Sequence, residues 1–314
     1  MRPPSQISLI ERKEALVIVN PTAHNAPKPA HLQKADEALR AAGWQAEWAE
    51  TTKRGEAQAL ASAAADRRVP LLFVCGGDGT LNEAVNGLAH SETVLAVIPA
   101  GTVNLWAREV GLMKRPHDAV TLVMAGERRL IDLGKAGGRY FLLMASYGLD
   151  AAVANRVSAS LKGRVGATAY AIAAAREALT YRGTPVKIRL DDEEHDIELL
   201  MLLAANTRSY AGLTTIAAHA QADDGLIDVC AFRGRGRWDI AWLALVTLFR
   251  QHRRSRKVLY RQVRRLQLLA DVAVPVQIDG DAVPEASTEI VVSPDSLWVA
   301  VPQRVKSPIF RPVT

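Results

Sequence analysis

Two glycine-rich turns carry the residues of this chain that are best suited to chemistry. The first, residues 76–83 (GGDGTLNE), follows the apolar run 71–75, and the second, residues 99–104 (PAGTVN), follows the apolar run 94–98. Glycine lets the backbone approach a ligand closely, and a helix N-terminus offers unpaired N–H groups that suit a phosphate. Asp78 would repel a phosphate unless a cation lay between the two charges. The first turn therefore indicates a metal-bound nucleotide rather than a bare phosphate.

The segments around these turns alternate between strand-like and helix-like patterns. The apolar run 15–19 predicts a buried strand that ends at Asn20, and a second strand over 44–50 ends before Thr51. Helices are expected over residues 31–42, 55–67 and 116–125. Such alternation implies a mostly parallel sheet, in which ligands bind beyond the carboxyl ends of the strands. Both glycine turns, Asn20 and Thr51 fall at such ends, so the pattern alone predicts one shared site.

Short strand-like runs separated by turn signals replace this alternation after residue 129. They cover residues 130–134, 140–144, 186–190, 197–203, 226–231, 266–269, 274–278 and 289–293. This pattern predicts a β-sandwich-type domain, interrupted by an alanine-rich helical segment at 158–180. We therefore expect an α/β domain over 1–129, which begins with a loose leader, and a β domain over 130–294.

The composition limits the class of protein. The chain has 314 residues, a net charge of +6 and a pI of about 9.4, so it is long enough for two domains and favours anionic partners. Only Cys75 and Cys230 occur, which indicates a reducing compartment rather than a disulfide framework. There is no signal-peptide core and no run near the roughly 20 apolar residues of a spanning helix. Without a nucleic-acid-binding motif, we expect no nucleic acid as a partner.

The two turns together resemble a known family. Residues 76–83 resemble the GGDGTxNE signature of the diacylglycerol kinase catalytic-domain superfamily, which includes the sphingosine, ceramide and bacterial lipid kinases, and residues 99–104 resemble its P-x-G-T-x-N motif. The resemblance covers nearly the whole chain. It implies a doubly wound α/β domain and a β-sandwich-type lipid-substrate domain, with the nucleotide in the interdomain cleft. It also implies that the last strand, 297–301, returns within segment 295–314 to the first domain.

The same resemblance implies an ATP- and Mg²⁺-dependent lipid kinase. Such an enzyme transfers the γ-phosphoryl group of ATP to a lipid hydroxyl, with diacylglycerol as the default acceptor and phosphatidic acid as the product. Residues 20–22 resemble the family's NPxxG nucleotide loop without its glycine, and Thr51 resembles a threonine that contacts ATP. The expected nucleotide-binding residues are Asn20, Pro21, Thr22, Thr51, Gly76, Gly77, Asp78, Gly79, Thr80, Leu81, Asn82 and Thr102.

Two acidic segments resemble metal-binding parts of the family's site. Asp132 matches an acid that belongs to an Asp–water–Mg²⁺ network. Residues 223–228 (DDGLID) resemble a segment that binds a structural Mg²⁺, and the ligands implied are Asp224 with the carbonyls of Gln221 and Leu226. Hard oxygen donors of this kind suit Mg²⁺. The structural alternatives are a solvated strand-edge carboxylate for Asp132 and an acidic hairpin turn for the second segment.

The catalytic residues implied by the resemblance are Asp78, Asp132 and Asp281. Asp281 occupies the place of the glutamate that serves the family as general base, and its side chain is one methylene shorter. The Asp-Gly pair at 279–280 is also a common hairpin signal, so a purely structural role stays open. Leu105 replaces an acid that the family commonly has after the second motif, which removes one polar group near the acceptor.

The apolar segment 238–249 lies between basic clusters, with arginines before it and Arg250 to Arg265 after it. The segment is too short to span a bilayer, but its tryptophans and the neighbouring arginines suit an interface with anionic headgroups. We therefore expect a cytoplasmic protein at the inner face of the membrane, where it meets its lipid substrate. The alternative is a core helix with a solvated basic tail, and a homodimer stays open.

Two other functions stay open. GGDGT is shared with NAD kinases, although the P-x-G-T-x-N motif, the D-G-D segment and the basic apolar segment argue against that acceptor. A nucleotide-binding, membrane-associated protein without activity is the third interpretation, supported by the missing loop glycine, Leu105 and Asp281. Transfer assays with lipid and with NAD separate the three functions.

Overall fold

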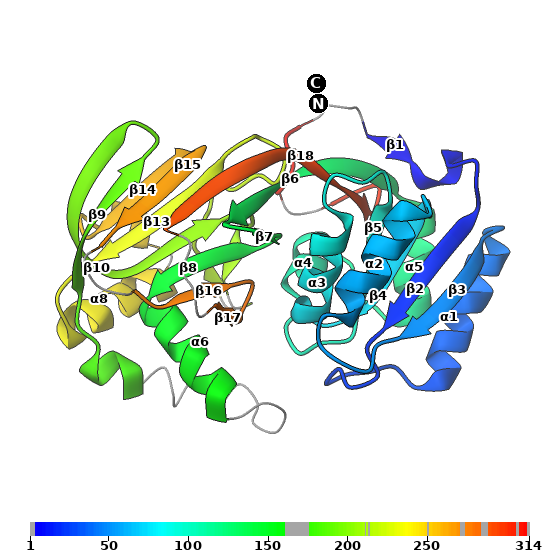
Figure 1. Cartoon of the computed structure of the whole chain (residues 1–314), viewed down its shortest axis with the longest axis horizontal. Helices are drawn as coiled ribbons and strands as arrows, with labels where there is room; N and C mark the ends of the chain where they lie inside the picture. Colours follow the sequence, from blue (N-terminus) through cyan, green and yellow to red (C-terminus); the bar gives the residue numbers. More distant parts are fainter. Residues whose placement is uncertain are drawn as a thin grey trace. The chain divides into compact units, whose positions relative to one another are not determined.

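The computed structural model describes residues 4–160, 176–210, 212, 214–249, 251–270, 274–283, 288–305 and 308–312. The chain divides into two compact units (Figure 1). The first comprises Met1–Leu133, Gln221–Gly225 and Ser293–Thr314, and the second comprises Gly134–Ala220 and Leu226–Val292. The main boundaries differ by a few residues from 129/130 and 294/295, and the assignment of Gln221–Gly225 to the first unit had no counterpart in our expectations.

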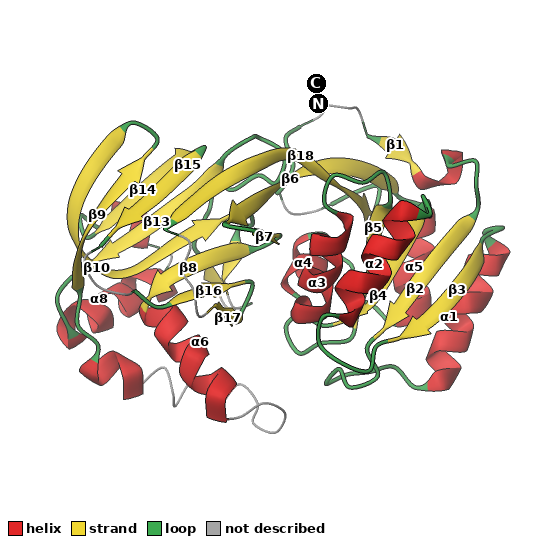
Figure 2. Cartoon of the chain, in the orientation of Figure 1, coloured by secondary structure: helices red, strands yellow, loops and turns green. Residues whose placement is uncertain are grey.

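Five parallel strands form the sheet of the first unit. They are β2 (Glu14–Val19), β3 (Gln45–Glu50), β4 (Leu71–Gly76), β5 (Val94–Pro99) and the C-terminal part of β18 (Glu289–Val301). Their order across the sheet is β18-β5-β4-β2-β3. Helices cover both faces of the sheet (Figure 2), which explains why β2 and β4 are apolar and buried along nearly their whole length. The predicted parallel α/β fold is confirmed.

The helices of the first unit pack in two pairs. α1 (Pro29–Ala41) lies against α5 (Pro116–Met124), and α2 (Glu56–Asp66) lies against α3 (Asp78–Leu88). Gly87 permits the close approach of the second pair, because a Cβ there would lie 2.5 Å from the carbonyl oxygen of Gln58 and 2.7 Å from the Cβ of Ala61. The short helix α4 (Leu105–Glu109) follows β5.

Residues near the N-terminus belong to the first unit, so the expectation of a loose leader was wrong. β1 (Ser5–Gln6) pairs with β6 (Glu127–Ala136), and the short 3₁₀ helix η1 (Ile7–Leu9) buries Ile7 completely. Burial of an isoleucine side chain is worth about 1.5–3 kcal/mol, which is enough to hold a short segment in place.

The second unit is built from antiparallel strands, as the prediction of a β-sandwich-type domain requires. They are β7 (Arg139–Phe141), β8 (Met144–Gly148), β9 (Thr184–Leu190), β10 (Glu193–Ala205), β13 (Ile227–Arg233), β14 (Val258–Val263), β15 (Arg265–Leu269), β16 (Val276–Ile278), β17 (Asp281–Val283) and the first residues of β18. β10 pairs with β8, β9 and β13. A separate two-stranded sheet contains β11 (Ser209–Tyr210) and β12 (Thr214–Thr215).

Apolar side chains pack on both faces of β10. Leu202 belongs to one buried cluster and Leu203 to another, as the alternation of side chains along a strand requires. Helix α8 (Arg237–Leu248) contributes Leu243 and Val246 to the second cluster. The other helical segments of the unit include α6 (Leu149–Ser160) and the 3₁₀ helix η2 (His252–Arg254).

Three expected elements differ from the structure. The run 140–144 is divided between β7 and β8, because the backbone at 142–144 binds a carboxylate described below. The runs 289–293 and 297–301 form the single strand β18, which continues through Pro294. The helical segment expected at 158–180 falls largely on 161–175, outside the described residues, and α6 begins earlier, at Leu149.

Candidate active site

The carboxyl ends of the parallel strands gather the predicted nucleotide-binding residues at one edge of the first unit. Asn20 follows β2, Thr51 follows β3, Gly77 follows β4 and Ala100 follows β5. β2 and β4 are neighbours in the sheet although β3 lies between them in the sequence, so the direction of strand progression reverses there. In open α/β sheets, ligands bind in the crevice at such a reversal.

A side-chain hydrogen bond joins the loops on the two sides of this reversal. Nδ2 of Asn20 donates to Oγ1 of Thr80 at 2.9 Å. Oδ1 of Asn20 accepts hydrogen bonds from the backbone N and the Oγ1 of Thr22, at 3.0 and 2.8 Å. The loop that contains Pro21 is therefore shaped by Asn20, although it lacks the glycine of the family motif.

Asn25 is a residue of this edge that sequence reasoning missed. Its backbone N donates to the carbonyl of Ala100 at 2.8 Å, and its Nδ2 donates to the carbonyl of Gly101 at 2.8 Å. The loop after β2 is thereby tied to the second glycine turn. An asparagine in a loop beside a predicted ligand site is a usable signal, because its side chain often bonds to the backbone of turns.

The two glycine turns contact each other. A Cβ on Gly101 would lie 2.6 Å from the Cα of Gly77, so a side chain there would force the turns apart. Gly79 differs, because a Cβ on it would meet no atom within 4 Å. Gly79 is exposed in the first turn of α3, which leaves space for a phosphate to approach the N–H groups of the helix N-terminus.

Asp78, the first residue of α3, links the two turns through its carboxylate. Its Oδ1 accepts a hydrogen bond from the backbone N of Leu105 at 2.8 Å. Burial raises the pKa of Asp78, while hydrogen bonds from the backbone of Leu105 and Asn104 and the charge of Arg108 oppose that rise. Because Leu105 contributes only its N–H group, this bond does not depend on the identity of its side chain.

The other predicted nucleotide-binding residues differ in their exposure. Thr51 is buried, and its Oγ1 lies 3.5 Å from the carbonyl oxygen of Val19. Leu81 and Asn82 are buried on the inner side of α3, whereas Thr102 is exposed in the second turn. Leu81 and Asn82 thus contribute to the packing of the helix, and their contact with a nucleotide stays a prediction.

Asp281 lies in the second unit, at the hairpin between β16 and β17. The two turn residues, Asp279 and Gly280, have φ angles of +47° and +85°, as a type I′ turn requires. The carboxylate of Asp279 accepts hydrogen bonds from the backbone N–H groups of residues 142–144 at 2.9, 3.0 and 2.8 Å. Oδ2 of Asp281 lies 2.7 Å from Nη2 of Arg139. The prediction of a hairpin at Asp279 and Gly280 is therefore confirmed, and the same turn fixes the orientation of the Asp281 side chain.

Two family models match the chain. A diacylglycerol kinase catalytic domain matches residues 14–136, and a YegS C-terminal NAD kinase beta sandwich-like domain matches residues 144–301. The chain belongs to the diacylglycerol kinase family of bacterial lipid kinases. The kinase is 30% identical over 272 residues to a diacylglycerol kinase of Staphylococcus epidermidis, a match that covers 86% of each chain. The predicted family and its lipid kinase activity are confirmed.

Two further relatives agree with this assignment. The kinase is 29% identical over 272 residues to a diacylglycerol kinase of Bacillus subtilis, which covers 86% of this chain and 90% of the relative. A crystal structure of a diacylglycerol kinase from Bacillus anthracis superposes with a TM-score of 0.74 at 21% identity, covering 94% of this chain and 99% of the other. At that identity the likeness concerns the fold.

Asp132 of the kinase ties together three segments of the first unit. Its Oδ1 accepts a hydrogen bond from the backbone N of Asp295 at 2.9 Å, and its Oδ2 accepts one from the backbone N of Gly225 at 2.6 Å. The residue is 3% exposed, so it is not a solvated edge carboxylate. Burial raises the pKa of Asp132, and the two backbone hydrogen bonds oppose the rise. Its part in a metal network stays a prediction.

The segment predicted to hold a structural Mg²⁺, residues 221–226, precedes β13. Asp223 is anchored there, since its Oδ1 accepts a hydrogen bond from the backbone N of Arg311 at 2.8 Å. Gln221 and Asp224 are partly exposed. Within the described ranges, no three His, Cys, Asp or Glu side chains are grouped to hold a metal ion. Because the predicted ligands are one carboxylate and two carbonyls, that finding leaves the prediction untested.

A buried polar network that sequence reasoning missed lies behind the D-G-D turn. Oε1 of Gln277 accepts a hydrogen bond from the backbone N of Gly280 at 2.6 Å, and its Nε2 donates to Ser146 and Asp150, both at 2.9 Å. The carboxylate of Asp150 also accepts hydrogen bonds from Ser146, at 2.5 Å, and from the hydroxyl of Tyr210. Gln277 therefore connects the D-G-D turn to buried polar side chains of the second unit.

Proposed function

We propose that the kinase transfers the γ-phosphoryl group of ATP to the hydroxyl of diacylglycerol in a Mg²⁺-dependent reaction. The observation that supports this most strongly is the position of Asp78, at the first residue of α3 and bonded to the second glycine turn. Beside it, Gly79 leaves open space at a helix N-terminus. Such an end suits phosphates, and an acid there suits a cation that the phosphates share. The residues present therefore fit a magnesium nucleotide.

The residues of the first unit account for binding and orientation. N–H groups at the start of α3 would donate to phosphate oxygens, and the Asn20–Thr80 hydrogen bond would keep the two loops in register. Asp78 would hold the Mg²⁺ ion, which neutralises charge on the transferred group. The exposed hydroxyl of Thr102 would donate to a phosphate or ribose oxygen.

Asp281 would act as the general base. The lipid oxygen forms a bond to the γ-phosphorus while the bond from that phosphorus to the bridging oxygen of ADP breaks, and the hydroxyl proton passes to the Asp281 carboxylate. The Arg139 contact and the type I′ turn fix the orientation of this carboxylate. Less conformational entropy is therefore lost when the carboxylate is aligned with the lipid hydroxyl.

We further propose that the segment before β13 binds a structural Mg²⁺. Its ligands would be the carboxylate of Asp224 and the backbone carbonyls of Gln221 and Leu226. Asp132 supports this role, because its hydrogen bond to the backbone of Gly225 holds the segment in place. Oxygen donors on a fixed turn suit a hard cation.

A transfer assay tests the proposed reaction. Radiolabelled γ-phosphate is supplied as ATP, and the acceptors are diacylglycerol, ceramide, a sphingoid base, monoacylglycerol, phosphatidylglycerol and NAD. We expect label in phosphatidic acid, and none when EDTA removes the metal. Asp78→Ala and Asp281→Ala should each lose most of the activity, whereas Asp118→Ala, which removes the exposed first-turn acid of α5, should keep it.

Other outcomes of the assay support the alternatives. Transfer to NAD but not to lipid would identify a NAD kinase, and ATP binding without any transfer would identify a non-catalytic nucleotide-binding protein. Transfer to a different lipid would keep the reaction and correct the acceptor. Full activity of Asp78→Ala would overturn the metal assignment.

A further inference from the structure

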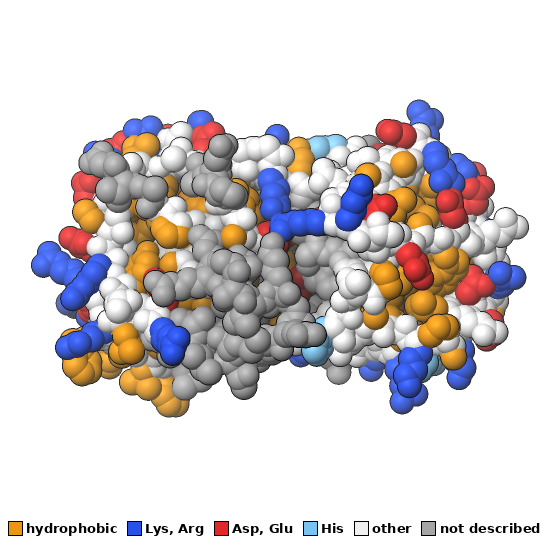
Figure 3. Space-filling model, turned by 60° about the horizontal axis from the view of Figure 1, so that its bottom comes forward, with side chains coloured by type: hydrophobic (Ala, Val, Ile, Leu, Met, Phe, Trp, Pro, Cys, Tyr) orange, Lys and Arg blue, Asp and Glu red, His pale blue; other side chains and the backbone are white. Residues whose placement is uncertain are grey.

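An apolar stripe runs along the solvent side of α8. Trp238, Trp242, Leu245 and Phe249 are 78%, 50%, 48% and 65% exposed. Their spacing of i, i+4, i+7 and i+11 places them on one face of the helix. Figure 3 shows hydrophobic side chains gathered at the lower left, at the end of the second unit that carries α8 in Figure 1, with Lys and Arg side chains beside them.

Packing on the opposite side of α8 keeps this stripe in the solvent. Leu243 and Val246 are 5% and 9% exposed and belong to the cluster beneath β10. At the start of the helix, Asp239 accepts a hydrogen bond from the backbone N of Arg235 at 2.8 Å and pairs with Lys257. Rotating α8 to bury the stripe would expose Leu243 and Val246, so the exposed aromatic side chains are a fixed feature of the second unit.

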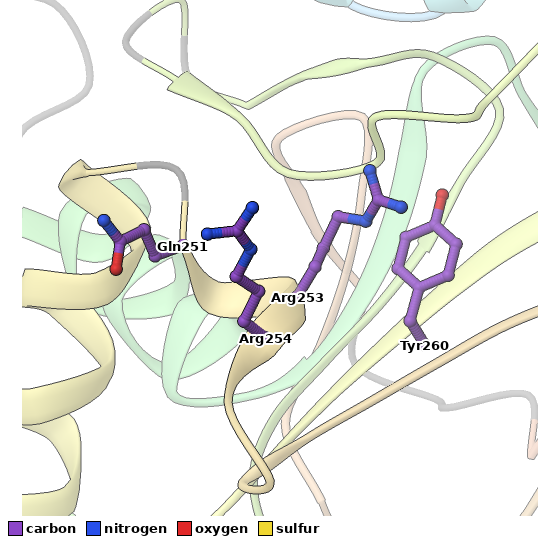
Figure 4. A pocket seen from close by; sticks show the side chains of 4 residues that line it. All are labelled: Gln251, Arg253, Arg254 and Tyr260. Carbon is purple, nitrogen blue, oxygen red and sulfur yellow. The ribbon is translucent and has the colours of Figure 1, made fainter.

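Two arginines lie just beyond the C-terminal end of the stripe. Arg253 and Arg254 belong to η2 and, with Gln251 and Tyr260, line a cavity of about 560 Å³ (Figure 4). Figure 4 shows both guanidinium groups extending to the same side of η2. The guanidinium of Arg253 lies 5.5 Å from the ring centroid of Tyr260 and contacts His219. The cavity is therefore cationic, and at least one of its arginines is held in place. Both features suit the binding of an anionic phosphate group.

Basic side chains also border the N-terminal end of the stripe. Arg235 and Arg237 are exposed there, and Arg237 lies 5.6 Å from the ring centroid of Trp238. Aromatic side chains between arginines suit the boundary between acyl chains and headgroups, where tryptophan and arginine are both stabilised. None of the described helices is long and apolar enough to cross a membrane.

We propose that α8 and η2 form a docking surface for an anionic bilayer. The stripe enters the acyl boundary, and the cavity of Arg253 and Arg254 receives the headgroup phosphate of an anionic phospholipid. A second copy of the chain fits less well, because a two-fold contact through the stripe would bring the arginines of both copies towards one another. The proposal deepens the proposed function, on which it rests only for the lipid nature of the acceptor.

Flotation with vesicles tests this surface, and it needs no ATP, so its result is independent of the kinase reaction. The full chain should float with phosphatidylcholine vesicles that contain phosphatidylglycerol and not with phosphatidylcholine alone. The double variant Trp238→Ser/Trp242→Ser should bind about tenfold more weakly or worse. Since each basic residue near an anionic surface is worth about fivefold, Arg253→Gln/Arg254→Gln should bind about 25-fold more weakly.

Matched control variants remove an apolar side chain or two positive charges from other parts of the surface. Leu269→Ser removes another exposed apolar side chain of the second unit, and Lys34→Gln/Arg40→Gln removes two exposed charges from α1. Both should bind as the parent does. If the stripe variants bind like these controls, or if the parent does not float with phosphatidylglycerol, the proposal is wrong. If the stripe variants instead convert a dimer into a monomer and leave flotation unchanged, a second copy covers the stripe and the proposal is also wrong.

A second measurement uses the unaltered chain and so does not depend on the folding of a variant. Phosphatidylglycerol with brominated acyl chains quenches tryptophans that reach the acyl boundary. Of the other four tryptophans, Trp44, Trp106 and Trp298 are only 2%, 1% and 3% exposed. Trp48 is partly buried, with its indole N–H bonded to Asp36 at 2.9 Å, so quenching reports mainly on Trp238 and Trp242. We expect strong quenching; binding without quenching would mean that another surface makes the contact.

Discussion

Asp78, the proposed magnesium ligand, lies where its charge works against the stability of the fold. Burial raises its pKa, so the folded chain favours the protonated form more than the unfolded chain does. The stability associated with this group is fully present below the ordinary aspartate pKa of about 3.9 and is lost as the pH rises through the raised value of the folded state. A partly buried carboxylate that lowers stability near pH 7 is what the proposed role in metal binding predicts.

Asp78→Asn removes the charge and keeps an oxygen that can accept the N–H of Leu105. We expect kinase activity to fall by about 10²–10³-fold, the usual effect of losing one electrostatic group at a reaction centre. The free energy of unfolding near pH 7 should exceed that of the parent, and the difference should shrink as the pH is lowered towards about 4. Thermal unfolding across this range measures the difference, and a less stable variant near pH 7 would contradict the assignment.

Replacement of Asp281 separates chemistry from binding. Asp281→Asn keeps the size of the side chain and removes the base, so kcat should fall by about 10²–10⁴-fold while the affinity for ATP is unchanged. Asp281→Glu has the length that the family uses and should match or exceed the parent. Initial rates at saturating ATP measure both variants, and melting curves control for loss of the Arg139 contact. An unaffected Asp281→Asn variant would place the base elsewhere.

The two glycine turns contact each other, and two of their glycines, Gly101 and Gly79, should respond differently to replacement by alanine. Gly101→Ala places a Cβ 2.6 Å from the Cα of Gly77, so the turns must separate. Stability should fall by about 1–3 kcal/mol and ATP binding should weaken. Gly79→Ala meets no atom within 4 Å and lies in a helix, so stability should stay the same or rise by up to about 1 kcal/mol. The KM of the Gly79→Ala variant for ATP should nevertheless increase, because the added methyl group fills the space through which we propose that a phosphate approaches the N-terminus of α3.

The hairpin that carries Asp281 depends on the network behind it. Gln277→Leu removes the acceptor for the N–H of Gly280 and a donor to the buried Asp150 carboxylate. We expect a loss of about 1–3 kcal/mol in stability and a lower kcat with little change in KM for ATP. Gln267→Leu is the matched control, because it removes a partly exposed glutamine of β15 that bonds to Arg189 and Glu289, and it should change kcat little. Equal kcat values for the two variants would show that Gln277 has only a structural role.

Most elements of the first unit could be predicted because β2, β4 and β5 are continuous apolar runs, each followed by a turn that contains glycine or asparagine. The same local signals identified the Asp-Gly hairpin. Contacts between distant loops could not be predicted, because a loop asparagine such as Asn25 indicates a bond to the backbone of some turn but does not specify Gly101 as the partner. No strand was predicted in the basic segment that forms β14, although it pairs with β13.

Across the whole molecule, the units are assembled from separate stretches of chain. Residues 221–225 and the end of β18 return to the first unit after long excursions through the second. Asp132 fixes these returns by bonding to the backbone of Gly225 and Asp295. Sequence patterns report local periodicity, so they located the end of β18 but not the contacts by which Asp132 holds both returns. A predicted catalytic acid thus has a structural role that only the fold reveals.

Nucleotide binding should raise the melting temperature of the chain. The loops that we propose to bind the nucleotide follow core strands of the first unit, so a ligand held there would stabilise that unit. At 100 times its Kd, a ligand that binds only the folded state adds about 2.7 kcal/mol, which raises the melting temperature by about 4 °C in a chain of 314 residues. We expect this shift with ATP and Mg²⁺, and not with ATP and EDTA. Asp78→Asn should abolish the shift and Asp118→Asn should keep it. An equal shift in EDTA would mean that the nucleotide binds without a shared cation, and that Asp78 is then a structural acid that joins the two turns.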